Sequence, residues 1–533
     1  MTLATVTGTG GMVTAPHRLA AEAGLSVLRD GGNAVEAAVA VAATLAAVYP
    51  HMTGIGGDGF WVIAEPDGRV HGIHGCGGAA AKADLALYAG LDAVPFRGPL
   101  AANTVAGTIS GWAAALAGVE AGAGAGANLP LERLLRDAVR HAEEGVAVTA
   151  GGAGIAADKG GELRVQPGAY GAVFEPGGVP LREGDMLRQP ALAQTLRTLG
   201  AEGLDTFYRG ELADLIAADL AELGSPVSGA DLAAHRATYP APLHAPIGGA
   251  QLYNSAPPTQ GFASLLILAL FDRLAAETAD GFAHVHGLVE ATKQAFLLRD
   301  RHVGDPEFHD FGHQALLDDS AALDALAARI DSGAALPWPQ PPQWGDTCWF
   351  AAADGEGRVV SAIQSTYFEF GSGLVLPRTG ITWQNRGSSF RLAASGWNAL
   401  RPGRKPFHTL NPALARFDDG RVMAYGTMGG EGQPQTQAAL FSRYARYGVD
   451  LQEAISRPRW LLGRTWGDQS TTLKLEDGFD EALYAALAAA GHDLERVGPL
   501  TATMGHAGAI VRHPDGRLEG ATDPRSDGGV AAW

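Results

Sequence analysis

The chain has 533 residues, of which 46% are apolar, so it can bury a large core in one unit or in several packed layers. Its formal net charge of −18 argues against a nucleic-acid-binding protein, because phosphate binding requires clustered lysine and arginine. Cys76 and Cys348 are the only cysteines, which excludes a disulfide framework and a cysteine-rich zinc site and is compatible with a reducing compartment.

The start of the chain carries no pattern typical of export. The first ten residues contain neither a basic nor an apolar segment, and no stretch of the sequence reaches the ~18 apolar residues of a membrane span. Segment 34–48 is alanine-rich and apolar on all sides, and Pro50 follows it, so it predicts a buried core helix. We therefore expect a cytoplasmic protein with no membrane partner.

Hydrophobic periodicity predicts further elements in both halves of the chain. Apolar residues recur at helical spacing in 131–144, 191–199, 212–223 and 283–298. Short β-rich runs bounded by glycine or polar residues predict strands at 60–64, 422–425 and 507–511. The alternating alanine and glycine residues of 121–127 predict a flexible surface loop. Strands in both halves with helices outside them predict an α+β fold with layered packing.

Thr347 opens the most informative segment of the sequence. It follows the proline- and tryptophan-rich stretch 337–344 and begins an apolar strand that reaches Ala353. A turn at 354–357 leads to a second strand over 358–364, which ends in a polar run of serine, threonine and tyrosine. The hairpin therefore places Thr347 at the end of one strand and the polar run at the end of its partner.

A threonine hydroxyl is a weak nucleophile until a base lies beside it, and a free α-amine on the same residue can be that base. Such an amine titrates near about 7.7 to 8.0, so it can accept the hydroxyl proton at neutral pH. Self-cleavage between Asp346 and Thr347 would release it. The local pattern alone also fits an ordinary hydroxyl at the start of a strand, so other segments must decide between the two interpretations.

Several motifs, in order along nearly the whole chain, resemble the γ-glutamyltransferase-like family of N-terminal nucleophile hydrolases. They are segments 31–40, 51–60, 103–108 and 255–261, the helix 286–300, and segments 426–430 and 521–526. The resemblance implies a four-layer αββα sandwich built from both halves of a precursor. Residues 1–346 would form the large subunit and residues 347–533 the small subunit of a heterodimer that is open to further dimerisation.

The resemblance assigns roles residue by residue. Thr347 matches the processing and catalytic threonine, with Asp346 on the other side of the cut. Ser365 falls where the family usually has a second threonine that hydrogen-bonds the nucleophile, and a serine hydroxyl can do the same. Gly429 and Gly430 match the pair whose backbone N–H groups form the oxyanion hole, where the absence of a Cβ allows close approach to the developing charge.

The expected substrate-binding residues depart from the γ-glutamyl pattern. Ser389 stands where γ-glutamyl enzymes hold the substrate's α-amino group with an acidic residue. Arg386 would instead repel an ammonium group and attract a carboxylate through a bidentate fork, unless it forms a structural ion pair. His408 and Thr409 occupy the place of a paired-serine segment, and Tyr367 of the polar run completes the set.

A positive group close to the nucleophile suits a small acid whose amide adjoins its carboxylate, and oxamate fits this description. Segments 364–365, 369–373, 383–387, 405–412, 432–437 and 456–467 resemble most closely the oxamate amidohydrolase branch of the family. We therefore predict an autoprocessing amidohydrolase that converts oxamate to oxalate and ammonia through an acyl-enzyme, without metal or organic cofactor. The alternatives are a γ-glutamyl hydrolase or transferase, a cephalosporin-type acylase, and an unprocessed binding protein.

Three other motifs are weaker signals for a site than they first appear. The histidines and aspartate of 309–313 have a spacing that could ligate a metal, but the neighbouring glycine and aromatic residues predict a loop. The glycine-rich segment 54–59 lacks the Lys-Ser/Thr of a phosphate-binding loop and precedes a strand, so nucleotide binding is not expected. His284 and His286 at the start of a helix predict capping or a packed surface.

Overall fold

The computed structural model describes residues 3–118, 128–338, 346–463 and 470–533. Three segments with sequence-based expectations fall partly or wholly outside these residues. They are the expected loop at 121–127, most of the proline- and tryptophan-rich stretch 337–344, and the end of the resemblance to the oxamate branch at 464–467.

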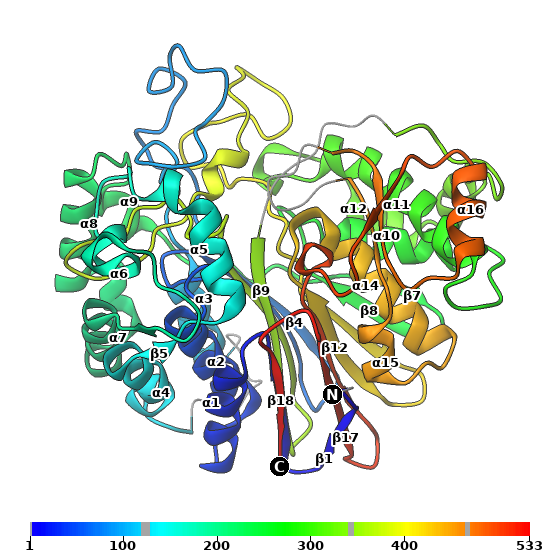
Figure 1. Ribbon diagram of the computed structural model, residues 1–533, viewed down its shortest axis with the longest axis horizontal. Coiled ribbons are helices and arrows are strands. Elements are labelled where there is room, and N and C mark those ends of the chain that lie inside the picture. The colour runs from blue at the N-terminus through cyan, green and yellow to red at the C-terminus, as the bar shows by residue number, and fades with distance from the viewer. Residues whose placement is uncertain (1–2, 119–127, 339–345, 464–469) are drawn as a thin grey trace.

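Two antiparallel β-sheets face each other at the centre of the molecule, and helices cover the outer face of each (Figure 1). The first sheet has the order β18 (Gly529–Ala532), β2 (Gly11–Ala15), β9 (Asp346–Asp354), β10 (Val359–Tyr367), β3 (Asp58–Ala64) and β4 (Val70–Gly75). The second has the order β1 (Val6–Gly8), β17 (Leu518–Thr522), β16 (Ala507–Arg512), β12 (Val422–Thr427), β11 (Ala413–Phe417), β8 (Ala250–Asn254) and β7 (Leu243–Ile247). This is the predicted αββα sandwich of the α+β class.

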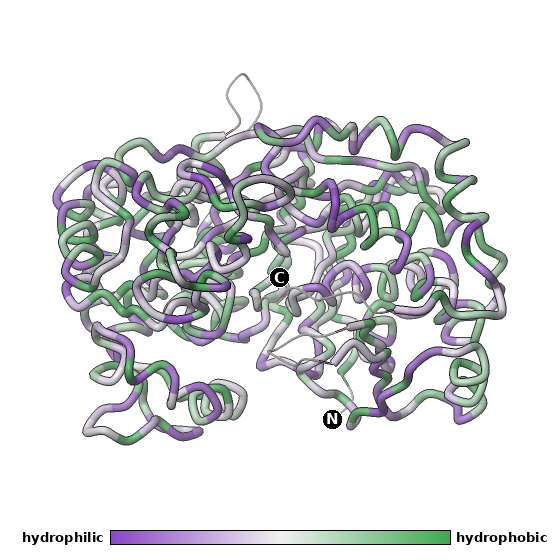
Figure 2. The backbone as a smooth tube through the Cα atoms, turned by 90° about the horizontal axis from the view of Figure 1, so that it is seen from above, coloured by the Kyte–Doolittle hydropathy of each residue, from purple (hydrophilic) through white to green (hydrophobic). Residues whose placement is uncertain are grey.

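The helices divide between the two outer faces. On the side of the first sheet lie α1 (Arg18–Arg29), α2 (Ala34–Val48), α3 (Thr108–Ala117), α4 (Leu131–Glu144), α5 (Ala150–Leu163), α6 (Tyr170–Phe174), α7 (Pro190–Glu202), α8 (Glu211–Glu222) and α9 (Gly229–Ala234). On the side of the second sheet lie α10 (Gly261–Phe271), α11 (Phe282–His302), α12 (His313–Asp318), α13 (Ser320–Ala327), α14 (Gln433–Phe441), α15 (Leu451–Ser456) and α16 (Glu481–Ala489). Seen from above, hydrophilic and hydrophobic stretches alternate along much of the backbone (Figure 2). Helices α2 and α10 differ from an amphipathic surface helix, because all of their residues are buried.

Two small sheets complete the described strands. One joins β5 (Val146–Ala147) to β6 (Met186–Leu187), and the other consists of β13 (Trp460–Leu462), β14 (Leu473–Glu476) and β15 (Leu494–Val497). Within the described residues, no helix combines the length and the apolar character that a membrane crossing requires.

The core forms three layers because the central strands are buried on both faces. Along β9, Cys348 and Phe350 pack toward the helices of the first sheet, whereas Trp349 and Ala351 pack between the two sheets. This alternation follows from the two-residue period of a strand. Thr347 has the same parity as Trp349, so its side chain belongs to the face that meets the second sheet.

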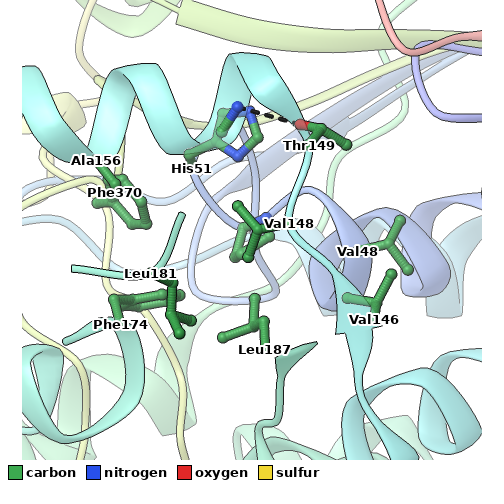
Figure 3. A pocket seen from close by; sticks show the side chains of 12 residues that line it. Val48, His51, Val146, Val148, Thr149, Ala156, Phe174, Leu181, Leu187 and Phe370 are labelled. Atoms are coloured by element: carbon green, nitrogen blue, oxygen red, sulfur yellow. Dashed lines mark hydrogen bonds between the residues drawn. The ribbon is translucent and has the colours of Figure 1, made fainter. Parts of the chain in front are cut away.

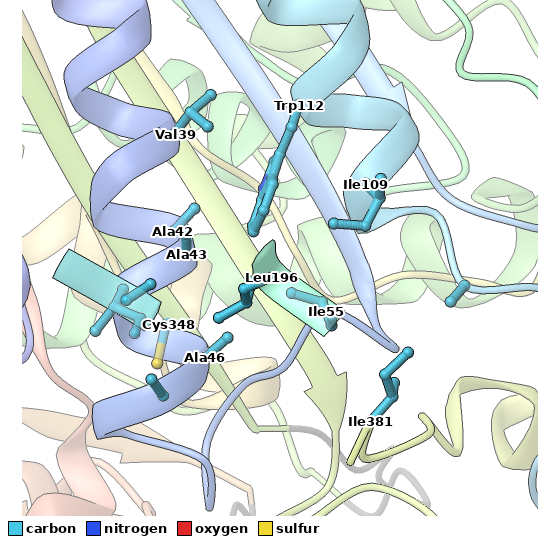
Figure 4. Close-up of a cluster of buried hydrophobic side chains, with 14 of the residues drawn as sticks. Val39, Ala42, Ala43, Ala46, Ile55, Ile109, Trp112, Leu196, Cys348 and Ile381 are labelled. Atoms are coloured by element: carbon cyan, nitrogen blue, oxygen red, sulfur yellow. The ribbon is translucent and has the colours of Figure 1, made fainter. Parts of the chain in front are cut away.

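Helix α2 packs on the first sheet, and its composition explains how closely it lies there. Asn33 accepts hydrogen bonds from the second and third backbone N–H groups of the helix, and Glu36 accepts one from the Asn33 N–H in return, which fixes the helix start at Ala34. The small side chains of 39–46 lie against Cys348 and neighbouring core residues (Figure 4). The buried helix predicted at 34–48 is therefore confirmed to the residue.

The two halves of the chain are interleaved in both sheets. Strands β9 and β10, which follow the expected cut, lie between β2 and β3 of the first half. In the second sheet β11 pairs with β8, and β1 pairs with β17. The N-terminal and C-terminal segments also meet, since Thr9 and Gly10 donate their N–H groups to the Trp533 carbonyl oxygen. Neither half could complete a sheet alone.

Candidate active site

A β-bulge marks the position of Thr347. Gln364 of β10 pairs with Cys348 of β9, but Tyr367 pairs with Asp346, so two residues of β10, Ser365 and Thr366, oppose the single Thr347. Such a bulge bends its strand and re-aims the side chains at it. The Ser365 hydroxyl accepts the N–H of Tyr367 at 2.8 Å inside the bulge. The structure thus brings the expected nucleophile and the expected second hydroxyl to the same place.

Thr347 is fully buried and meets a side chain that the sequence analysis did not identify. Gln433 Nε2 donates to Thr347 Oγ1 at 3.3 Å. Gln433 is the first residue of α14 and belongs to segment 432–437, which the sequence marked only as a family likeness. The sequence signal that could have identified Gln433 is its position, three residues after the second of the expected oxyanion glycines.

The turn that holds those glycines lies between β12 and α14. Gly429 has φ 118° and Gly430 has φ 53°, both in the region that disfavours residues with a Cβ. A Cβ on Gly429 would also lie 3.3 Å from the Cα of Gly505. Earlier in the same motif, a Cβ on Gly426 would come within 2.3 Å of the Trp349 ring, so glycine there lets β12 approach β9 closely.

Gln260, just before α10, holds this turn in position. Its Nε2 donates to the carbonyl oxygens of Gly430 at 2.8 Å and Thr409 at 2.7 Å. Its Oε1 accepts from the Arg299 guanidinium at 3.0 Å, and Arg299 forms an ion pair with Glu431 at 3.4 Å. This fully bonded network fixes the glycine turn and the Thr409 segment relative to each other.

Arg386 is a buried cation that forms no ion pair within 4.0 Å with a carboxylate of the described residues, although the charge of Asp58 acts on it from a longer distance. Its guanidinium carbon lies 3.6 Å from the centre of the Tyr367 ring, and one nitrogen donates to Thr409 Oγ1 at 3.2 Å. The side chain is 1% exposed, yet no carboxylate of the described residues forms an ion pair with it. Burial lowers the pKa of Arg386 to about 10, so it stays charged at neutral pH. The alternative of a structural ion pair therefore finds no partner in the described part of the chain.

Tyr367 supports this cation from a strained backbone. Its φ of 84° is uncommon for a residue with a side chain, and such conformations cost on the order of 1–3 kcal/mol. Because Tyr367 pairs with Asp346, the ring that carries Arg386 belongs to the residue opposite the expected cleavage site. Ser389 lies in the same short helical turn as Arg386, half-buried, with Oγ 3.4 Å from the Phe407 carbonyl oxygen.

Asp58 is a second side chain that the sequence analysis missed. It pairs with Ser365 across β3 and β10, and its Oδ1 accepts the N–H of Gly107 at 3.0 Å and Gln384 Nε2 at 3.2 Å. Its Oδ2 lies 3.4 Å from His408 Nε2. The sequence signal that could have identified Asp58 is its place in the glycine-rich segment 54–59, because a simple glycine turn does not require an acidic residue.

Burial decides the protonation of this pair. Burial raises the pKa of Asp58 to about 7, although the Arg386 charge and hydrogen bonds from Gln384 and Gly107 oppose the shift. Burial and then the Arg386 charge hold the pKa of His408 well below its usual range. His408 is therefore neutral, and near neutral pH Asp58 exists in both protonation states.

A third polar cluster, on α11 and its neighbours, is structural. Among the described residues, His286, Glu290 and His492 lie close enough to hold a metal, with candidate ligand atoms within 4.8 Å of one another. However, Lys293 Nζ already lies 2.7 Å from Glu290 Oε1, and His286 bonds both His492 and the Asp331 carbonyl oxygen. The Lys293 ammonium group thus already pairs with the Glu290 carboxylate, and the cluster is a hydrogen-bond network that joins α11 to its neighbours.

The weaker sequence motifs do not gather into sites. His309 lies in a loop, 2.9 Å from an Arg404 nitrogen. His313 begins α12 and forms a hydrogen bond with the His302 carbonyl oxygen. Of the two expectations for His284 and His286, a packed surface is wrong, because both are at most 1% exposed. Capping finds support at His284, whose Nδ1 accepts the N–H of Asp280 just before the helix. Helix α11 contacts α10, α14 and α16, so its first turn is part of the core.

The apolar pocket in Figure 3 is separate from these residues. Val146, Val148, Phe174 and Phe370 line it together with His51, and the expected catalytic residues do not contribute to its wall. Its lining offers few polar groups to orient a small acid.

Comparison with known proteins gives a consistent result. The family model described as gamma-glutamyltranspeptidase matches residues 20–533. The oxamate amidohydrolase proenzyme of Klebsiella pneumoniae is 54% identical over 98% of this chain and 99% of its own length. The glutathione hydrolase-like YwrD proenzyme of Bacillus subtilis is 39% identical over 98% of each chain. The crystal structure of cephalosporin acylase from Bacillus halodurans superposes with a TM-score of 0.90 and 33% identity, covering 100% of this chain and 97% of the acylase.

Proposed function

Because this chain belongs to the gamma-glutamyltranspeptidase family, we propose that it is an autoprocessing hydrolase of a small carboxylated amide, with oxamate as substrate. Membership makes it an N-terminal nucleophile hydrolase that acts on C–N bonds. The finer proposal concerns the substrate, the cut between Asp346 and Thr347, and the residues that act on the amide.

In the proposed reaction, Thr347 Oγ1 attacks the oxamate carbonyl carbon while the released α-amine of Thr347 takes the hydroxyl proton. The N–H groups of Gly429 and Gly430 stabilise the oxyanion, and each such donor contributes about 3 kcal/mol in the transition state. The C–N bond then breaks, and the nitrogen takes the proton back and leaves as ammonia. Water attacks the oxalyl ester on Thr347 and releases oxalate. The Ser365 hydroxyl keeps Thr347 oriented throughout.

The observation that carries the proposal is the buried charge of Arg386. A guanidinium that is 1% exposed and lacks a described carboxylate partner is suited to a substrate carboxylate. It rests on Tyr367, opposite Asp346, so the carboxylate it would bind lies near the nucleophile. Oxamate has its carboxylate on the carbon next to the amide. A γ-glutamyl substrate would need an anion for its ammonium group, and Ser389 provides none.

The test is intact-mass measurement of the purified protein, followed by ammonia release from oxamate with glutamine, glutathione and a glutaryl amide as controls. We expect two fragments, one beginning at Thr347, and oxamate-dependent ammonia. Thr347→Ala should abolish both. Arg386→Met should raise the KM for oxamate at least tenfold while leaving self-cleavage intact, and Arg391→Met, an exposed cation of the same loop, serves as its control.

Each other outcome discards a defined part of the proposal. Cleaved protein that releases glutarate but no oxalate would favour an acylase. Cleaved protein active only on glutathione would favour a γ-glutamyl hydrolase. A single uncut and inactive chain would favour the alternative of an unprocessed binding protein.

A further inference from the structure

We propose that Gln433 is a further catalytic residue of this reaction, whose Nε2 orients the nucleophile and whose Oε1 accepts an N–H of the scissile carboxamide. This role rests on the proposed function. It would make the enzyme selective for amides over esters of the same acid.

The first observation is that Gln433 is bonded at only one end of its amide. Its Nε2 donates to Thr347 Oγ1, whereas its Oε1 is buried and has no hydrogen-bond partner among the described residues. Leaving a buried carbonyl unpaired costs about 1–3 kcal/mol. Among the described residues, Asn103, Gln384 and Asn411 also have a buried amide oxygen without a hydrogen-bond partner. Gln433 differs from these three because the other end of its amide contacts the expected nucleophile.

The neighbouring glutamines of α14 show what a structural side chain does at this depth. Gln435 Nε2 donates to the Leu462 carbonyl oxygen at 3.1 Å, and its Oε1 accepts the Leu462 N–H at 2.8 Å. Gln437 bonds the Asn411 carbonyl oxygen and the Asn254 amide. All three glutamines are at most 1% exposed. Gln433 alone of these three points its carbonyl oxygen at nothing in the described protein.

The second observation is the distance from the reacting atoms. Bond lengths place the oxygen and nitrogen of one amide roughly 2.2 Å apart, so Oε1 lies within about 5.5 Å of Thr347 Oγ1. Once Oγ1 has bonded to the substrate carbon, the scissile nitrogen lies about 2.3 Å from Oγ1. A hydrogen bond of about 2.9 Å from that nitrogen reaches acceptor atoms up to about 5.2 Å from Oγ1, which covers nearly all of the range open to Oε1.

This contact would act on the leaving group. As the C–N bond breaks, its electron pair stays on nitrogen, which takes one proton from the Thr347 α-ammonium and leaves as ammonia. Gln433 exchanges no proton and only accepts a hydrogen bond from an N–H that the substrate already carries. Arg386 would hold the carboxylate at the other end of the molecule, so the two side chains together would select a primary amide beside a carboxylate.

The experiment compares oxamate with monomethyl oxalate, an ester that has the same carboxylate and carbonyl but no N–H. Both pass through the same oxalyl-enzyme, so kcat/KM reports the acylation step for each. We expect Gln433→Met to lower the amide-to-ester ratio of kcat/KM about tenfold. The matched control is Gln435→Met, which should lower the melting temperature and leave the ratio unchanged. An unchanged ratio in Gln433→Met would overturn the inference.

Self-cleavage gives an independent measurement, because the contact with Thr347 Oγ1 already exists in the uncut chain. Gln433→Met should cleave more slowly than Gln435→Met. If it does not cleave at all, Gln433→Glu replaces it, because a protonated carboxyl group can still donate to Thr347 Oγ1 and keeps an acceptor oxygen. Its amide-to-ester ratio should stay within about threefold of wild type, and a tenfold fall would overturn the inference. If wild type does not turn over oxamate, the proposed function fails, while equal cleavage rates in the methionine variants would separately refute the Gln433 contact.

Discussion

Burial sets the charges of the ionisable residues near Thr347, and it does so in two opposite ways. Arg386 keeps its charge inside the protein because a ring face, a hydroxyl and a carbonyl oxygen replace part of its hydration. Asp58 responds differently. The loss of water on burial raises the pKa of its carboxyl group, and the positive charge of Arg386 offsets only part of this rise. The pair thus provides a fixed positive charge beside a carboxyl group that titrates near neutrality.

The raised pKa of Asp58 predicts a defined pH dependence of stability. Below about pH 4 the carboxyl is protonated in both the folded and the unfolded chain. Between about pH 4 and the folded pKa of about 7, the unfolded chain has lost this proton and the folded chain retains it. Stability should therefore fall as pH rises through this window, by up to roughly 1.4 kcal/mol per pH unit from this group, and level off above it.

The measurement is denaturant unfolding of Thr347→Ala and Thr347→Ala/Asp58→Asn between about pH 4.5 and 8.5. The uncut background keeps each sample a single chain, and the slopes of other groups cancel between the two proteins. The Asp58→Asn protein should lose the downward slope below about pH 7. Parallel curves would show that Asp58 ionises at its ordinary pKa.

At the scale of elements, the link between β12 and α14 carries most of the candidate chemistry. In the space of a few residues it supplies the two positive-φ glycines, the Glu431 partner of Arg299, and Gln433 at the start of α14. Gln260 holds the same link from α10. A helix start and a glycine turn place several N–H groups and one side-chain amide in one small region, which is the arrangement that an acyl-transfer site requires.

Substituting the first glycine tests this link. Gly429→Ala should lose about 1–2 kcal/mol of stability from its left-handed φ and its contact with Gly505, and on the order of 10²-fold in turnover. Gly448→Ala is the matched control, because Gly448 also has positive φ, 64°, but no atom lies within 4 Å of the position that a Cβ would take there. Both variants are compared by melting temperature and kcat. Equal turnover in the two would remove Gly429 from the oxyanion hole.

At the scale of the whole molecule, the expected cut at residue 346 passes through the middle of a continuous structure. Strands β9 and β10 lie between strands of the first half, and residues of both halves fill the layer between the sheets. Removing either fragment would expose strand edges and all three core layers. The cost of separation therefore exceeds that of dividing two domains at a linker.

We accordingly expect the processed fragments to stay together in native buffer. Size-exclusion chromatography should give one peak containing both fragments, and denaturing electrophoresis of that peak should give two bands. Separation should require denaturant at concentrations that also abolish the circular dichroism of the sheets. Fragments that elute apart in native buffer would contradict the interleaved packing.

Signals within single segments of the sequence predicted the positions of α4, α7 and β10 to within a few residues. Helix α4 matches the predicted range 131–144 because its apolar stripe, with Pro130 before it and Gly145 after it, lies within one segment. Helix α7 starts at Pro190, one residue before the prediction, because proline is tolerated at the first position of a helix. Strand β10 runs to Tyr367, beyond the predicted 364, because the bulge extends its pairing with β9.

The sequence by itself determined the αββα fold, the membership of the family, and the hairpin that carries Thr347, because periodicity, caps and ordered motifs are properties of short segments. Only the tertiary structure decided that Asp58 lies beside His408, that Arg386 stacks on Tyr367, and that Gln433 contacts Thr347. These contacts join residues that lie from about twenty to several hundred positions apart, and no local pattern encodes them. They arise because two sheets and their helices must pack without gaps, which brings distant polar groups into one buried place where loss of water sets their charge.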